Sequence, residues 1–328
     1  MLYILIGIHL VLAQEEAEEK YNMPDWLQNT AQWYTHGKIS ESTFINAFRY
    51  AIQHGLFLVE PREEAQEAIA GTITTGTSAI QAGQPKNCLT NNFPMVDWSG
   101  CNFSGVDLNH YNLHDSNLTE TNLAGADLEK AYMMNADMRH ANLDYAQMTN
   151  ADLPGADLAY SSMKGVLGQF LDLRFADMTG ADLSGSHLIG TSANWSVMRG
   201  VNLTNSDVNH SEFLSVDMSG SQARGANFEE CLLVDVNFTS TDASSADFRD
   251  ADLSGSNMTG ANLAGAGFQN AGLGFADLRG ADLSGANLDH ADLGGADLSG
   301  ANLTGTSLSG TVLAGANMHC IGNPACIR

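Results

Sequence analysis

The feature that most constrains the fold of this chain is a period of five residues. From Phe93 to Met318 every fifth residue is apolar, at 46 positions in all, and only Gly168 breaks the rule. A small residue is common two places before each apolar one, Asp or Asn stands between them, and Gly often follows two places later. Residues 281–285, Ala-Asp-Leu-Ser-Gly, form the clearest unit. Because no insertion shifts the register, the stretch must fold as one repetitive element.

A period of five matches neither the 3.6-residue repeat of a helix nor the two-residue repeat of a strand. Self-similarity at a fixed period predicts a solenoid. The apolar and small residues should point inward, and the Asp or Asn between them outward, as alternation in an extended segment requires. The last two residues of each unit turn the chain, which favours Gly. Successive coils should stack about 4.8 Å apart through backbone hydrogen bonds.

Tandem Ala-(Asp/Asn)-Leu-x-x units resemble the pentapeptide-repeat family, over about two thirds of the chain. The resemblance implies an all-β fold, a right-handed quadrilateral parallel β-helix with four units per coil. We place this β-helix at residues 92–318, in about 11.5 coils, followed by a C-terminal cap at 319–328. The family fold does not fix a function. Its members include DNA-mimicking proteins that bind type II topoisomerases.

The interior is short of volume at four positions where a large apolar residue would normally stand. These are Gly168, Ala193, Ala223 and Ala243. Close packing of protein interiors requires neighbours to fill such space. Near Gly168 we expect the filling side chain to be Leu167, Phe170 or Leu171.

The chain begins with an apolar run, residues 1–13, that is too short to span a membrane. Val11 and Ala13 fit the small positions of a cleavage site, and a glutamate-rich segment follows. No Lys or Arg precedes the run, so either the true start lies upstream or the signal is atypical. We expect export, with the protein secreted or at the cell surface and no membrane span in the mature chain.

Residues 22–60 predict a small α-helical hairpin. Pro24 suits a first helical turn, Gly37 a helix end, Ser40 a second N-cap and Gly55 a second end. This segment resembles a short module found in exported proteins of ammonia-oxidising archaea. A short helix and a linker should occupy residues 61–91, which are rich in Gly, Thr, Ser and Gln towards their end.

The net charge and the placement of the cysteines limit the kinds of partner and the cellular compartment that we expect. The net charge is −24, with 14 Lys and Arg against 38 Asp and Glu, so we expect no binding to nucleic acid. Cys320 with Cys326, and Cys88 with Cys101, stand at the two ends of the repeat and are expected to form disulfides in an exported protein. Cys231 falls at an inward position and should be a small buried apolar residue.

No constellation in the sequence indicates catalysis, a metal site or a cofactor. Three histidines fall on one face but four or five coils apart: His110, His210 and His290. Three outward aspartates stack in one column: Asp137, Asp157 and Asp177. Ca²⁺ could relieve their repulsion, but the repeat itself places Asp at this position. We therefore expect no enzyme, no bound metal and no cofactor.

Several outward positions near the middle of the repeat are apolar, against its polar rule. On one face these are Phe175, Trp195, Leu214, Leu232 and Val234, and at the adjoining corner Leu167, Phe170 and Ile189. A contiguous exposed apolar patch indicates an interaction site. Three explanations stay open: the N-terminal hairpin or linker covers the patch, another chain or a second copy binds it, or these side chains turn inward to fill the missing volume.

The sequence thus predicts an exported, non-enzymatic interaction scaffold or structural protein that binds a protein partner or itself. The alternative is an acidic DNA-mimicking inhibitor of a type II topoisomerase. The signal-like start weighs against that alternative. So does the tail of ten residues after Met318, because the resemblance implies that dimeric mimics end in a pairing helix.

Overall fold

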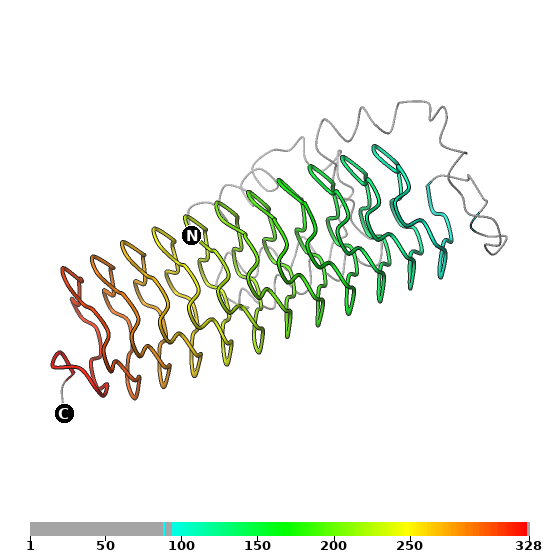
Figure 1. The fold of residues 1–328 in the computed structure, drawn as a ribbon. Helices are drawn as coiled ribbons and strands as arrows, with labels where there is room; N and C mark the ends of the chain where they lie inside the picture. Colours follow the sequence, from blue (N-terminus) through cyan, green and yellow to red (C-terminus); the bar gives the residue numbers. More distant parts are fainter. Residues whose placement is uncertain (1–87, 89–93, 327–328) are drawn as a thin grey trace, which may run out of the picture. The chain divides into compact units, whose positions relative to one another are not determined.

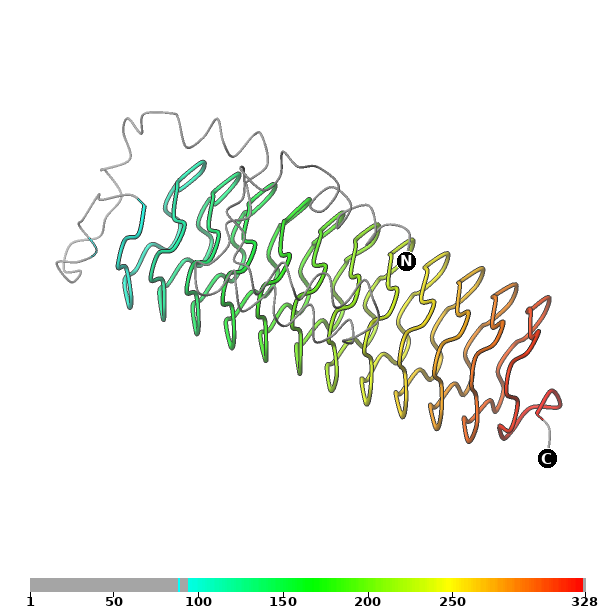
Figure 2. The ribbon, with the colours of Figure 1, turned by 180° about the vertical axis from the view of Figure 1, so that it is seen from behind.

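The computed structural model describes residue 88 and residues 94–326. All of them belong to the second of two units into which the chain divides, Arg62–Arg328. The predicted signal-like segment, the helical hairpin and the linker lie outside the described residues. We call residues 94–318 the rod, because their coils stack along one axis from the N-terminal to the C-terminal end (Figures 1 and 2).

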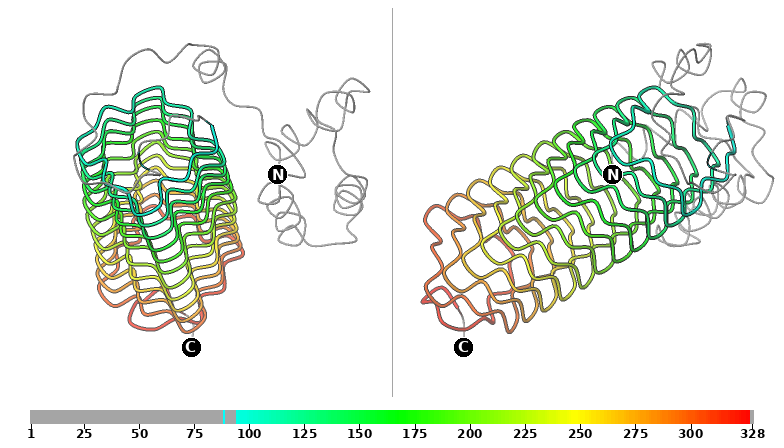
Figure 3. Two further views of the ribbon diagram at one scale, coloured as in Figure 1. Left: turned by 90° about the vertical axis from the view of Figure 1, so that its right-hand side faces the viewer. Right: turned by 45° about the vertical axis from the view of Figure 1, so that its right-hand side comes forward.

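The regular structure of the rod consists of single-residue parallel bridges. Each joins residues twenty apart, from Asp97↔Asn117 to Asp297↔Asn317. One such bridge occurs in every five-residue unit, at the residue predicted to face outward. Four units therefore make one coil, as the family resemblance implies, and Figure 3 shows the coils nested on one another.

Each coil has four faces, which we name by their outward residues. Outward residues recur at every twentieth position, from Asp97 to Asn317 on face A, Asn102 to Asn302 on face B, Asp107 to Ser307 on face C and Asn112 to Val312 on face D. Within a unit such as 101–105 we speak of the small, outward, core, first turn and second turn positions, in that order. Corners between faces are formed by the two turn positions.

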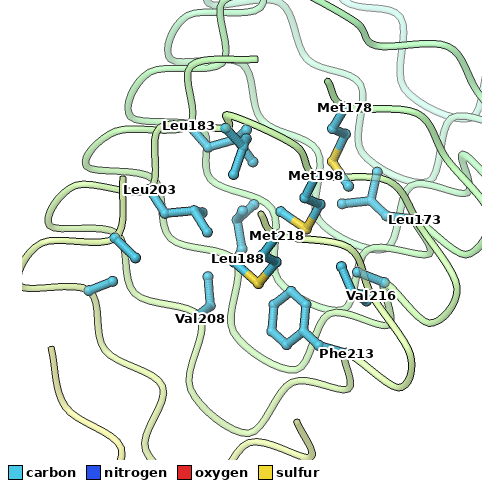
Figure 4. Close-up of a cluster of buried hydrophobic side chains, with 14 of the residues drawn as sticks. Leu173, Met178, Leu183, Leu188, Met198, Leu203, Val208, Phe213, Val216 and Met218 are labelled. Carbon is cyan, nitrogen blue, oxygen red and sulfur yellow. The ribbon is translucent and has the colours of Figure 1, made fainter. Parts of the chain in front are cut away.

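The core positions fill the interior. Every one of them is buried from Trp98 to Leu303, and almost all small positions beside them are buried too. In Figure 4 the side chains of Met178, Met198 and Met218 line up on successive coils and point toward leucines from the other faces. The alternation of buried and exposed residues predicted from the sequence is thus confirmed.

Leu171 supplies the volume missing at Gly168. A methyl group added to Gly168 would lie 2.7 Å from Leu171 Cδ1 and 2.9 Å from Leu188 Cδ2, so the space is already full. Leu171 is buried, whereas Leu167 and Phe170 are exposed. Of the three candidates named from the sequence, only Leu171 therefore fills the gap.

Phenylalanines fill the interior further along the rod. Phe228 stacks on Phe248 at 5.0 Å between ring centroids, and Phe248 stacks on Phe268 at 4.9 Å. Phe228 and Phe248 belong to the same coils as Ala223 and Ala243, where face B has a small core residue. Stacked aromatic pairs add to the stabilisation that burial alone provides.

In every unit from Met95 to Gly315, the residue at the second turn position has a positive φ, between 52° and 76°. Most non-glycine residues avoid this left-handed region, because Cβ approaches the backbone. Yet 24 of these positions are not glycine. Asn, Asp and His are frequent among them, and no Val, Ile or Thr occurs. The frequent glycine seen in the sequence is therefore the commonest solution to a conformational demand that every unit makes.

Disulfides join Cys88 to Cys101 and Cys320 to Cys326, the two pairs that the sequence favours. Cys231 is free and buried at a small position, and its S–H donates to the Val208 carbonyl oxygen at 3.0 Å. Burial raises the pKa of the Cys231 thiol to about 12. This cysteine is a structural residue, since an inert thiol is expected in such a site.

Candidate partner-binding surface

The predicted apolar patch divides into two sets, one on face C and its corner with face D, the other on face D and its corner with face A. The face C set is largely solvent-exposed. Leu167 is 47% exposed and Phe170 52% exposed, while Ile189 on the next coil is half-buried. The backbone here is regular, because Leu167 pairs with His187 in the standard register. These side chains therefore point outward and do not fill the interior.

The face D set is more covered than the sequence predicts. Phe175 is only 8% exposed, which corrects the expectation of an open side chain, although it lies outside the hydrophobic core cluster. Its ring stacks on the half-buried Trp195, at 5.1 Å and an interplanar angle of 16°. Leu232 is exposed, and Leu214 and Val234 are half-buried.

Charged and polar groups are buried beside Phe175. Asp172 is 1% exposed and accepts two hydrogen bonds from the Arg174 guanidinium, at 2.8 and 2.6 Å. On the next coil the Asn194 amide donates to Glu212 at 2.9 Å and accepts from the Leu214 N–H at 2.8 Å. A buried charge is tolerated when it is paired and hydrogen-bonded. Sequence analysis missed this polar network.

A sequence signal for the pair exists. Asp at an outward position and Arg at the following first turn position recur at 137/139, 247/249 and 277/279, and each pair forms the same forked contact. At those three sites the guanidinium is largely exposed. The motif therefore predicts the ion pair, but only the neighbours on face D decide that Asp172 is buried.

Large aromatic residues occupy second turn positions mainly in one part of the rod. Five of them stand between residues 145 and 195, namely Tyr145, Tyr160, Phe170, Phe175 and Trp195, and the sixth is Phe275. Each adopts the left-handed conformation, which costs a bulky residue about 1–2 kcal/mol relative to glycine. Residues held in disfavoured conformations cluster at functional sites. Aromatic residues at these corners are thus concentrated between residues 145 and 195, although every unit makes the same conformational demand.

An aromatic ring at a second turn position leans toward the next coil. A methyl group on Gly165, Gly190 or Gly295 would lie 2.7 Å from the rings of Tyr145, Phe170 or Phe275 respectively. Where the next coil has another ring, the two stack, as His140 does with Tyr160. Five of the six aromatic turn residues are thus matched twenty residues later by glycine or by a second ring, whereas Trp195 is followed by Ser215.

Face C is also free of carboxylates beside the exposed set. Its three successive units 146–150, 166–170 and 186–190 contain no Asp or Glu, whereas Asp127 and Asp207 flank them on the same face. In a chain with a net charge of −24 this makes a neutral apolar window. Burying it against a partner would not require desolvating a carboxylate.

The remaining outward carboxylates are held by their neighbours. Where Asn follows Asp one coil later, its amide donates to the carboxylate, as Asn202 does to Asp182 at 3.0 Å. Arg139 holds the pKa of Asp137 below its usual range, whereas burial and the nearby Asp177 raise the pKa of Asp157. In the described residues no group of three ligands could hold a metal ion.

The histidines do not form a common site. His210 contacts Glu230 at 3.1 Å, and the His290 ring lies against Gly310. Within residues 94–326 no helix is long and apolar enough to cross a membrane.

Comparison with known proteins agrees with this geometry. The pentapeptide-repeat family model matches residues 99–167 and 170–319 in eight copies, about two thirds of the chain. Among solved structures, HetL from the cyanobacterium Nostoc sp., a pentapeptide repeat protein involved in heterocyst differentiation regulation, is 25% identical over 72% of this chain and 93% of its own, with a TM-score of 0.38.

Two further solved structures are similar to this chain. QnrB1, a plasmid-mediated fluoroquinolone resistance protein, is 20% identical over 59% of this chain and 86% of its own, with a TM-score of 0.35. A thylakoid-lumen protein of Arabidopsis thaliana is 26% identical over 42% and 69%, with a TM-score of 0.21. No curated protein sequence matches the chain. The repeat geometry and the family match together show that this chain belongs to the pentapeptide-repeat family.

Proposed function

We propose that this protein is an exported, non-enzymatic interaction scaffold. Its rod presents a rigid surface, and a protein partner binds the apolar patch on the central coils. The patch consists of the face C set (Leu167, Phe170 and Ile189) and the face D set (Phe175, Trp195, Leu214, Leu232 and Val234). The signal-like start and the disulfides at both ends of the rod support a role outside the cytoplasm.

One observation carries the proposal: in the carboxylate-free window, Leu167 at an outward position and Phe170 at a second turn position are about half exposed. Elsewhere most outward positions hold Asp, Asn or another polar residue, and second turn positions most often hold Gly, so nothing in the fold demands these two residues. Solvent-exposed apolar groups on a rigid surface favour association, because water is released from them.

The double variant Trp195→Asp with Phe175→Ser tests which occupant covers the face D set. If another chain binds there, the hydrodynamic size of the wild type exceeds that of the variant. If the N-terminal segment binds there, the variant is cut faster by protease in residues 71–87, with no change in size. A second double variant, Leu167→Ser with Phe170→Ser, probes the face C set in the same assays.

Phe275→Ser provides the matched control. Phe275 stands at the same turn position as Phe175, five coils away, and is 80% exposed. We expect this variant to behave like the wild type in both assays. If the Trp195→Asp and Phe175→Ser variant unfolds the rod, these side chains belong to the core and the face D part of the proposal is wrong.

The rival function is inhibition of a type II topoisomerase by an acidic DNA mimic. The cellular location of the protein and its effect on gyrase supercoiling distinguish this function from our proposal. Our proposal expects the processed protein outside the cytoplasm and no effect on gyrase supercoiling. An unprocessed cytoplasmic protein that inhibits supercoiling would overturn it.

A further inference from the structure

Among the residues that the structure describes, the C-terminal end of the rod is covered on only part of its cross-section. The tail, residues 319–326, folds back over face B. There Leu303 N–H donates to the Ile321 carbonyl oxygen at 2.8 Å, and Ile321 N–H donates to the Ala301 oxygen at 2.9 Å. Ile321 thus takes the place of a next coil on this face, and the Cys320–Cys326 disulfide closes the tail.

Faces C and D of the last coil, residues 306–315, form an open edge. Leu308 and Leu313 are only partly buried there, although every core position from Trp98 to Leu303 is fully buried. Val312, between them, is 48% exposed. The open edge therefore has an apolar floor made by the end of the core.

Hydrogen bonding between coils has a direction. In an inner unit, Leu123 and Gly125 donate their N–H groups to the following coil, to the Asn142 and Asp144 oxygens, while Asn122 donates to the preceding coil, to the Cys101 oxygen. This pattern recurs along the rod. Each unit consequently presents two donors and one acceptor toward the C-terminal end.

At the open edge these donors are unused. The N–H groups of Leu308, Gly310, Leu313 and Gly315 donate to no described residue, whereas the Thr306 oxygen already accepts from the Asn323 amide. An unpaired strand edge is a template for a further strand. Here the template has an excess of donors over acceptors.

This excess disfavours a second copy docked through the same edge. The same edge of a second rod would set N–H groups against N–H groups, and both chains are strongly acidic. An extended segment running parallel to the edge would instead offer its carbonyl oxygens, as the following coil does at every inner position. Strand addition of this kind obtains affinity from main-chain hydrogen bonds and specificity from side-chain pockets.

We propose that the open edge at residues 306–315 binds an extended segment of a protein partner, which adds as a parallel strand in the position of the next coil. Its apolar residue packs on Leu308 or Leu313, and small residues flank it. This site is separate from the patch on the central coils, so either proposal can fail without the other.

A peptide with the sequence of residues 286–295, Ala-Asn-Leu-Asp-His-Ala-Asp-Leu-Gly-Gly, is a suitable probe. Within the rod this segment pairs in parallel with the opposite side of residues 306–315, and it has the five-residue spacing that a following coil would present to the open edge. Titrated into the isotope-labelled full chain, it should shift the amide resonances of Leu308, Gly310, Leu313 and Gly315 saturably. The same amides should exchange more slowly with deuterium.

Leu313→Asp should weaken peptide binding roughly tenfold or more, because the apolar contact is lost. Phe275→Ser and a peptide of shuffled sequence serve as controls, the first binding as the wild type does and the second not at all. If Leu313→Asp frays the end of the rod, the wild type alone still tests the proposal, because the added peptide should slow deuterium exchange of its four edge amides. Unchanged amides at millimolar peptide would overturn the proposal, as would shifts that depend on protein concentration without peptide, which indicate a second copy at the edge.

Discussion

Phe175 and Phe275 occupy the same turn position on face D, five coils apart, with φ values of 61° and 59°. One is 8% exposed and the other 80% exposed. The backbone that carries them is identical in register and hydrogen bonding. The difference therefore comes from the outward side chains around them and not from the fold.

Around Phe275 face D is almost bare. Its unit, residues 271–275, reads Ala-Gly-Leu-Gly-Phe, and Gly295 follows it on the next coil. Around Phe175 the unit reads Leu-Asp-Leu-Arg-Phe, and Trp195 stacks on the ring. The rod thus keeps a constant interior while its surface changes from coil to coil, which is what a binding scaffold requires.

The largest effect should come from the core, where the two regions are alike. Leu173→Ala and Leu273→Ala should each destabilise the rod by about 2–5 kcal/mol, the usual cost of a buried Leu to Ala change. Leu173→Ala should be the costlier, because Ala193 on the next coil leaves a larger joint cavity than Leu293 does. Denaturant unfolding measures both. Equal losses below about 1 kcal/mol would contradict the account of the interior.

Replacing the arginine should destabilise the rod by different amounts in the two regions. Arg174→Ala removes the forked guanidinium contact from the buried Asp172 and should cost about 3 kcal/mol. Arg279→Ala breaks the corresponding exposed pair with Asp277 and should cost less than about 1 kcal/mol. Thermal unfolding of both variants gives the comparison. Similar small losses would show that Asp172 is not held in a buried site.

Replacing the phenylalanines should show the same contrast at smaller scale. Phe175→Ser should cost about 2 kcal/mol, because a largely buried side chain is lost. Phe275→Ser should change stability by no more than about 0.5 kcal/mol, as for most exposed positions. A loss at Phe275 as large as that at Phe175 would remove the distinction drawn here.

The smallest effect should be a gain. Phe275→Gly relieves the left-handed conformation and gives up little burial, so it should raise stability by up to about 1 kcal/mol. Phe175→Gly should instead lower stability, since the stacking with Trp195 is lost. The sign of the two changes, read from the midpoint of urea unfolding, is the test.

The fold could be predicted from the sequence because one rule repeats without interruption. The inward and outward positions and the burial of Cys231 follow from the period of five, and the twenty-residue coil follows from the resemblance to the pentapeptide-repeat family. The site could be predicted only in part. Leu167 and Phe170 stand out as apolar residues at polar positions, and both are exposed as expected.

The burial of Phe175 and Asp172 could not be read from the sequence. Both depend on contacts between coils, such as the Phe175–Trp195 stack, and not on the local unit. The positive φ at the second turn position of each unit was also not predicted. The lack of Val, Ile and Thr at this position is a sequence signal for it. Unless this left-handed conformation is known, the energetic cost of an aromatic residue at these corners cannot be inferred from the sequence.

The central claim, that the patch on the central coils binds a protein, is tested most directly by photo-crosslinking in intact cells. A photoreactive phenylalanine analogue is placed at Phe170 and, as the matched control, at Phe275. The account predicts a discrete cross-linked adduct from position 170, reduced by Leu167→Ser, and none from position 275. Equal adducts from both positions, or none from position 170, would contradict it.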